Sequence, residues 1–241
     1  MERIVFLDRS TVTVAFPELP FPHQWMEYKT TSQTQILDRL KDATVAITNK
    51  IPIREDVLSK LPDLKLIIVA ATGYDCIDIE ACRRRGIPVC NLRHYTLNSV
   101  PEHTIMLLLN LRRNFVKYQE LVKAGEWQKS NSFTVNSLPI NDLFGSVLGI
   151  IGYGALGRGV ERIARGFGMD ILIAERKGAT EVRHGRVPFE EVLGGADAIA
   201  IHSPLTPETR NMIGREEFKL LKPSAVLVNC GRGGLIDEVA L

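Results

Sequence analysis

A glycine pattern between an apolar strand and a helix constrains this chain more than any other feature. The run Val147–Ile151 is apolar and predicts a buried strand, and Gly152, Gly154 and Gly157 follow it as G-x-G-x-x-G. The first glycine permits a tight turn, the second lets the backbone approach a pyrophosphate, and the third allows a helix to pack closely on the strand. The pattern therefore predicts the first strand, turn and helix of a dinucleotide-binding βαβ unit.

The residues that follow the glycines favour a nicotinamide dinucleotide. N–H groups in the first turn of a helix lack partners and lie at its positive end, so we expect Ala155 and Leu156 to bind phosphate. Glu175 ends the next predicted strand, where a carboxylate accepts hydrogen bonds from the adenosine ribose of NAD. A surface glutamate in a tight turn is the plain alternative. The adjacent Arg176 and Lys177 suit the extra phosphate of NADP, so the sequence favours NAD and leaves NADP open.

Short apolar runs alternate with helical patterns along the chain, which is typical of parallel β/α layers. Strands are predicted at Ile4–Leu7, Val45–Thr48, Leu66–Ala70, Pro88–Cys90, Val147–Ile151, Ile171–Ala174, Ala198–His202 and Ala225–Asn229. Helices are predicted at Gln33–Lys41, Arg54–Lys60 and Ile79–Arg85, and a longer one at Asn98–Ala124 connects the two series. We expect an α/β protein of two doubly wound parallel-sheet domains: a substrate domain at 1–98 and an NAD(P)-binding domain at 99–241, incomplete at its C-terminus.

Composition argues against several classes of protein. Thirty basic and twenty-eight acidic residues leave a formal net charge of +2, which favours neither a nucleic-acid nor a membrane-surface partner. No apolar run is long enough to span a bilayer. The four cysteines lack the C-x-x-C spacing of metal and redox motifs, so we expect no metal site and a cytoplasmic protein with free thiols.

Several ordered motifs carry a resemblance to a known family. The segments "IIGYGALGRGVERIARGFGMDILIAER", "IHSPLTPETRNMIG" and "LKPSAVLVNCGRGGLIDEVAL" resemble the cofactor domain of the D-isomer-specific 2-hydroxyacid dehydrogenases. The earlier "AATGYDCIDIEACRRRGIPVCNLRHYTLNSVPEHTIMLLLNLRRN" resembles the same family's substrate-domain end and connecting helix. The resemblance covers about residues 64–241, and the first sixty residues fit the family's flavodoxin-like lobe. The motif "SVPEH" is most similar to the glycerate dehydrogenase (hydroxypyruvate reductase) branch.

This resemblance implies hydride transfer between NAD(P) and a small 2-keto or 2-hydroxy acid, such as hydroxypyruvate/D-glycerate or glyoxylate/glycolate. It assigns Arg232 as the catalytic, substrate-binding arginine. The chemistry agrees, since a guanidinium can bind a carboxylate and polarise the adjacent carbonyl. A structural pair with an acid such as Glu238 is the alternative. The backbone amides of Thr72 and Gly73 are implied to bind the substrate carboxylate, although a plain βα turn fits the same residues. Further cofactor contacts are implied at Thr104, Pro204, Thr209, Cys230 and Gly231.

The family's proton-donating histidine and its partner glutamate lie beyond the R-G-G motif, and this sequence ends before either. His94, His103 and His202 are the nearest substitutes, and each is more often structural in such a position. We therefore expect the 241-residue chain itself to be inactive. A non-catalytic NAD-binding or scaffold protein on the same fold, like the family's corepressor relatives, is the second hypothesis. The resemblance and the apolar segment Asn98–Ala124 also predict a homodimer formed through the cofactor domains.

Overall fold

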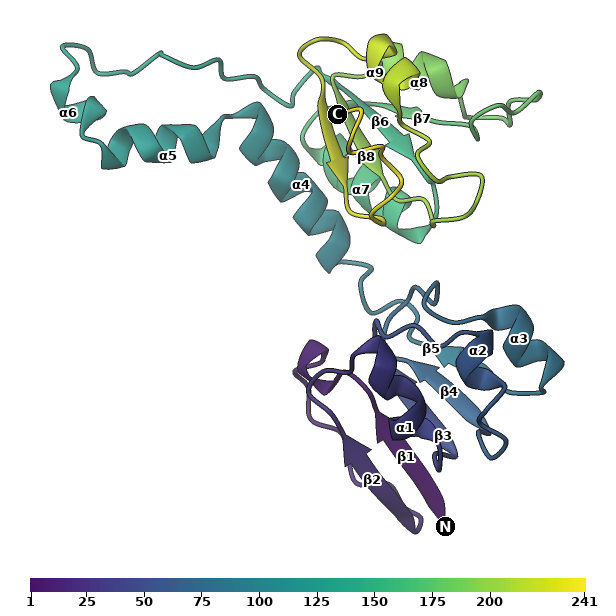
Figure 1. The fold of residues 1–241 in the computed structure, drawn as a ribbon. Coiled ribbons are helices and arrows are strands. Elements are labelled where there is room, and N and C mark those ends of the chain that lie inside the picture. The colour runs from purple at the N-terminus through teal and green to yellow at the C-terminus, as the bar shows by residue number, and fades with distance from the viewer. The chain divides into compact units, whose positions relative to one another are not determined.

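Parallel strands form two separate sheets, one in each half of the chain (Figure 1). The computed structural model describes all residues, Met1–Leu241. Their contacts divide the chain into two units, Met1–Tyr95 and Thr96–Leu241. The predicted α/β class with parallel sheets is confirmed. No helix is long and apolar enough to cross a membrane.

The first unit contains a five-stranded sheet in the order β2-β1-β3-β4-β5, the strand order of flavodoxin-like folds. Edge strand β2 is absent from the sequence predictions because its residues, "HQWME", are mostly polar and none of them is buried. The elements are β1 (Glu2–Phe6), η1 (Arg9–Thr11), β2 (His23–Glu27), η2 (Gln33–Gln35), α1 (Ile36–Leu40), β3 (Val45–Thr48), α2 (Glu55–Leu58), β4 (Leu66–Val69), α3 (Ile79–Arg84) and β5 (Val89–Asn91).

Side chains of this sheet alternate between two apolar clusters, as the pleat of a strand requires. Val5 and Leu7 belong to the cluster that contains the buried residues of α1, α2 and α3. Ile4 and Phe6 belong to a smaller cluster on the other side, with Ile47. All three helices of the unit therefore pack on one face of the sheet.

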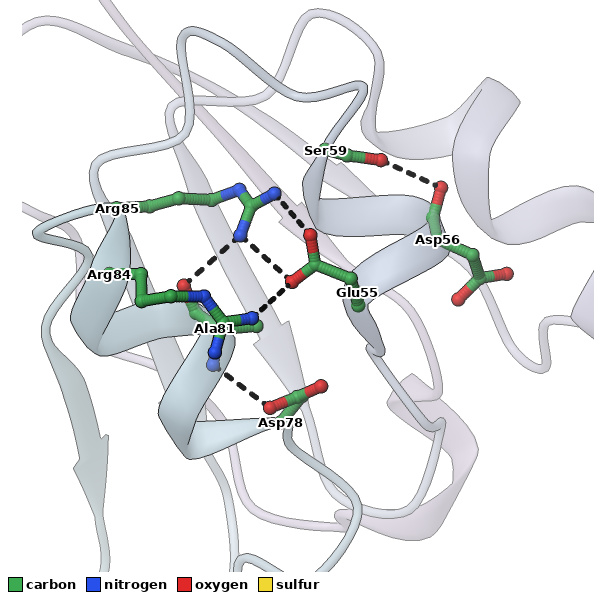
Figure 2. A network of polar contacts seen from close by, with 7 residues as sticks. All are labelled: Glu55, Asp56, Ser59, Asp78, Ala81, Arg84 and Arg85. Atoms are coloured by element: carbon green, nitrogen blue, oxygen red, sulfur yellow. Dashed lines mark hydrogen bonds and ion pairs between the residues drawn. The ribbon is translucent and has the colours of Figure 1, made fainter.

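A polar network joins α2 to α3 beside the loop that follows β4 (Figure 2). The Glu55 carboxylate accepts hydrogen bonds from Arg84 Nη2 and Arg85 Nη1, both at 2.9 Å. Asp78 caps α3 by accepting a hydrogen bond of 2.9 Å from the Ala81 N–H. The ion pairs are half exposed and contribute little energy, but they join α2, which precedes β4, to α3, which follows this loop.

The second unit contains a four-stranded sheet in the order β7-β6-β8-β9. The chain moves outward from the central β6 first to one side and then to the other, which creates a switch point at the carboxyl ends of β6 and β8. The elements are α4 (Ser99–Arg112), α5 (Phe115–Lys123), α6 (Glu126–Lys129), β6 (Val147–Ile151), α7 (Ala155–Gly166), β7 (Asp170–Ile173), α8 (Phe189–Gly195), β8 (Ala198–Ile201), α9 (Arg215–Leu220) and β9 (Val226–Asn229).

Helices cover both faces of this second sheet. Leu148 and Ile150 of β6 pack in the cluster that includes α4 and α7, whereas Ile151 packs in the cluster that includes α8. At Gly149, a Cβ atom would lie 2.5 Å from Val192 Cγ1 of α8. A side chain at this position would therefore push α8 off the sheet.

The prediction of one long helix at Asn98–Ala124 is wrong. Helix α4 ends at Arg112, and α5 begins at Phe115 after Asn114, whose φ of 50° is left-handed. Asparagine adopts this conformation more readily than most residues, and Asn114 Nδ2 donates a hydrogen bond of 2.7 Å to Pro139 O. Helices α5 and α6 extend away from the sheet of the second unit (Figure 1), and no residue of α5 is buried.

Candidate functional site

A cavity of about 580 Å³ lies at the switch point of the second sheet. The segments after β6, β7 and β8 all contribute to it, as expected for the carboxyl ends of parallel strands. Its lining residues are Ile151, Gly152, Tyr153, Ala174, Glu175, Arg176, Lys177, Arg183, Arg186, Phe189, Ser203, Pro204, Thr206, Glu208, Thr209 and Met212.

The three glycines after β6 meet different surroundings. Gly152 has a φ of 93°, and a Cβ atom there would lie 2.6 Å from the backbone of His202 and Ser203. At Gly157 a Cβ would lie 2.6 Å from the carbonyl oxygen of Gly152. Gly154 has a φ of −93°, and a Cβ there would meet nothing within 4 Å. Protein packing thus requires glycine at 152 and 157. At 154 the protein itself has room for a side chain, so packing does not explain the glycine there.

Helix α7 begins directly after Gly154 and offers unpaired donors. It is twelve residues long, and no side chain caps its N-terminus. The N–H groups of Ala155 and Leu156 have no acceptor one helical turn earlier. Open space over Gly154 and uncapped amides beside the cavity fit the pyrophosphate of a dinucleotide.

Glu175 is only 4% exposed and is the most heavily bonded side chain at the cavity. Its carboxylate accepts hydrogen bonds from the Arg176 N–H at 2.8 Å and from three nitrogen atoms of Arg183. The hydrogen bonds from Arg183 hold the pKa of Glu175 well below its usual range, so the group is ionised at any neutral pH. Lys177 is engaged elsewhere, since it pairs with Glu217 at 2.7 Å.

The other sequence-predicted cofactor residues fall into two groups. Pro204 and Thr209 line the cavity, and Thr209 Oγ1 donates a hydrogen bond of 2.7 Å to Pro204 O. Thr104, Cys230 and Gly231 do not line it. Thr104 is fully buried, and its hydroxyl donates to Val100 O at 2.8 Å within its own helix. That is the bond that a purely structural threonine would make.

Arg232 lies in a hydrogen-bonded turn after β9. Asn229 Nδ2 donates to the carbonyl of Arg232 at 2.8 Å, and Asn229 Oδ1 accepts from the Gly231 N–H at 3.0 Å. The guanidinium is half-buried and donates to Gly231 O at 2.9 Å. The asparagine therefore fixes the backbone that carries the arginine.

Thr72 and Gly73 follow β4 in the first unit. The carbonyl of Thr72 accepts a hydrogen bond of 2.7 Å from Asn91 Nδ2, which steadies the loop. The N–H groups of Thr72 and Gly73 donate to no protein acceptor. Their amides are thus available to an anion.

Sequence reasoning missed Tyr153, Arg183, Arg186 and Phe189, which line the cavity. The hydroxyl of Tyr153 donates to Glu161, and this bond raises the pKa of Tyr153. Arg183 and Arg186 reach the site because Val187 forms a parallel bridge with Ala174, next to Glu175. No local sequence pattern predicts the bridge between Val187 and Ala174. The only sequence signal for this pairing was the presence of two arginines shortly after a strand that ends in an acid.

The three candidate histidines lie in different surroundings. His94 and His103 are exposed. Both ring nitrogens of His202 are buried without a hydrogen-bond partner, and this burial lowers the pKa of His202 to about 4. His202 is therefore neutral at physiological pH.

The low pKa of His202 predicts a loss of stability in acid. The unfolded chain takes up a proton on this imidazole near pH 6.5, whereas the folded chain does so only near pH 4. The contribution of His202 to the free energy of unfolding therefore falls as pH drops between these values. His202→Phe should remove this part of the pH dependence, at most about 3 kcal/mol, and the exposed His103→Phe should not. Urea unfolding at pH 7, 5.5 and 4.5 measures the difference; parallel pH profiles for wild type and His202→Phe would contradict it.

Comparisons with known proteins agree with this geometry. Residues 105–241 match the family described as D-isomer specific 2-hydroxyacid dehydrogenase, NAD binding domain. The chain is 46% identical over 241 residues to the glycerate dehydrogenase of Methylorubrum extorquens, a match that covers 100% of this chain and 76% of that protein. It is 34% identical over 211 residues to the hydroxypyruvate reductase of Blautia hydrogenotrophica, covering 86% and 66%. The solved structure of D-lactate dehydrogenase from Aquifex aeolicus, complexed with NAD and lactic acid, is similar with a TM-score of 0.79 at 28% identity, covering 98% and 71%. The chain therefore belongs to the D-isomer-specific 2-hydroxyacid dehydrogenase family.

Proposed function

We propose that this oxidoreductase reduces hydroxypyruvate or glyoxylate, with D-glycerate or glycolate as the product. The family is NAD-dependent and acts on 2-hydroxy acids, and the glycerate dehydrogenase and hydroxypyruvate reductase relatives support the choice of a short substrate. The observation that carries the proposal is the open space over Gly154 at the uncapped start of α7, next to the cavity.

NAD is the cofactor of this family, and when bound it exchanges a hydride with the substrate carbon. We propose that Gly154, Ala155 and Leu156 hold its pyrophosphate through backbone N–H groups. Pro204 and Thr209 line the cavity, which supports the proposal that they contact the cofactor. Thr104, Cys230 and Gly231 do not line this cavity, and their proposed contact with the cofactor rests on the family resemblance.

We propose that Arg232 binds the substrate carboxylate and polarises the keto group. A planar guanidinium can donate two parallel hydrogen bonds, and the turn held by Asn229 limits how far its backbone can move. The free N–H groups of Thr72 and Gly73 support their proposed role in binding the same carboxylate. Binding the carboxylate and polarising the keto group do not supply the proton that the keto oxygen gains, so proton transfer requires another group.

Residues 1–241 are proposed to bind cofactor and substrate without supplying the proton donor. Support comes from the histidines, since His202 is buried and neutral and His94 and His103 are exposed without a defined partner. The match covers 76% of the Methylorubrum relative, so about a quarter of that protein has no counterpart in these residues.

A homodimer through the second unit is also proposed. Helix α5 buries none of its residues, and Phe115, Val122 and Trp127 are each at least half exposed on α5 and α6. An exposed set of large apolar side chains on a projecting segment is typical of a protein interface. A cytoplasmic location is proposed as well, supported by four free cysteines.

Substitution of Gly154 by valine should weaken NADH binding without unfolding the protein. A side chain there meets no protein atom within 4 Å, but it would fill the space that the pyrophosphate needs. We expect NADH affinity to fall at least about tenfold, measured by fluorescence titration, with a small change in melting temperature. Gly166→Val is the control, because its Cβ also meets nothing and it ends the same helix. Equal NADH affinity in the two variants would remove Gly154 from the site.

Arg232→Lys should lower the rate of glyoxylate and hydroxypyruvate reduction. An ammonium cannot make the paired contacts of a guanidinium, so KM should rise and kcat fall. NADH oxidation is measured for residues 1–241 and for the chain with any residues that its reading frame encodes after Leu241. Positioned acid catalysis contributes about 10²–10⁴-fold, and we expect the 241-residue form to lack it. Equal rates for two different lengths would place the donor within residues 1–241, and inactivity of every form would favour the non-catalytic alternative.

Charge placed on the projecting helix should separate the dimer. The double variant Phe115→Lys and Val122→Lys introduces two cations into the proposed interface, where desolvation makes them costly. Light scattering at micromolar concentration should report a dimer for the wild type and a monomer for the variant. Leu220→Lys, at an exposed apolar position on α9, is the control. A monomeric wild type would refute the proposal.

A further inference from the structure

The adenosine end of the cavity contains a carboxylate whose bonding capacity is already used. Glu175 Oε1 accepts from the Arg176 N–H and from Arg183 Nη2, and Oε2 accepts from Arg183 N at 3.2 Å and Arg183 Nε at 2.7 Å. Two carboxylate oxygens offer about four lone-pair positions. No position is left for the two hydroxyls of a ribose unless Arg183 moves.

The arginines around Glu175 are held there by the backbone. The Glu175 N–H donates to Val187 O at 2.8 Å, and Val187 N donates to Ile173 O at 2.9 Å. Arg186 Nη1 donates to Ala174 O at 3.0 Å, and its Nε lies 3.9 Å from Glu175 Oε2. The segment that carries both arginines is thus anchored to the end of β7.

The cavity wall around this carboxylate is positively charged. Three arginines, Arg176, Arg183 and Arg186, line the cavity with two acidic side chains, Glu175 and Glu208, and the fourth cation, Lys177, is paired with Glu217. Arg183 remains 54% exposed while it is bonded to Glu175. Arg176 is exposed and has no ion pair in the structure. A carboxylate shielded in this way no longer repels an anion, whereas donors on two guanidinium groups remain available to one.

We propose that Arg183, with Arg176, forms a binding site for a 2′-phosphate on the adenosine ribose, so that this protein binds NADP(H) at least as tightly as NAD(H). This inference rests on the proposed dinucleotide site and specifies its ligand further. Glu175 acts as the residue that positions Arg183 and not as the acceptor of the ribose hydroxyls. For NAD(H) to use Glu175, the Arg183 side chain must first leave the carboxylate.

Equilibrium binding tests this inference without any turnover. NADH and NADPH differ only in the 2′-phosphate, so the ratio of their dissociation constants, from fluorescence titration, isolates that group. We expect the wild type to bind NADPH at least as tightly as NADH. Arg183→Ala should weaken NADPH relative to NADH about tenfold or more, because a charge-assisted contact is lost. Arg162→Ala, which removes the same charge from an exposed position of α7 outside the cavity, should leave the ratio unchanged.

The possible outcomes separate the proposed 2′-phosphate site from the proposed dinucleotide-binding function. A wild type that binds NADH more tightly than NADPH overturns this inference and leaves the dinucleotide site intact. Binding of neither overturns the proposed function itself. The wild-type ratio needs no variant, so it decides even if Arg183→Ala fails to fold.

Discussion

The close approach of two strand ends in the second unit determines the geometry of the cofactor site. Gly152 turns the chain after β6 at a φ of 93° while its Cα faces the backbone of His202 and Ser203, where even a methyl group would lie within 2.6 Å. That contact brings the ends of β6 and β8 together and sets the direction in which α7 leaves the sheet. Because a parallel sheet places every strand's carboxyl end at one edge, the segments after β7 and β8 meet the same turn.

The ionisation state of each buried titratable group at this edge of the sheet depends on its hydrogen-bond partners. Glu175 is buried and ionised because Arg183 and backbone N–H groups satisfy it, whereas His202 is buried and neutral because nothing satisfies it. Burial without partners favours the uncharged form, and burial with donors favours the anion. Glu175 is therefore charged and His202 uncharged at the same edge of the sheet, because only Glu175 has hydrogen-bond partners that compensate for its burial.

Strands were easier to predict from the sequence than the contacts between side chains. Val45–Thr48 and Val147–Ile151 are strands with the predicted bounds, because a buried parallel strand is apolar on both faces. Edge strand β2 carries no such signal, and the break at Asn114 depends on a bond to Pro139, twenty-five residues away. The turn after β6 was predictable because the spacing of its glycines is a local sequence pattern. The pairing of Glu175 with Arg183 arises from the return of the chain at Val187 and needs three-dimensional information.

The left-handed residue Asn114 also divides the second unit by local stability. Helix α4 buries Ile105 and Leu108 in the core, whereas α5 has nine residues and buries none. A helix of that length is marginal in water without tertiary support. We therefore expect opening of α5 to cost little free energy and to leave the sheet intact, so that amide hydrogens of α5 exchange with solvent while those of α4 stay protected. The α5 segment becomes a rigid part of the protein only when another surface covers it.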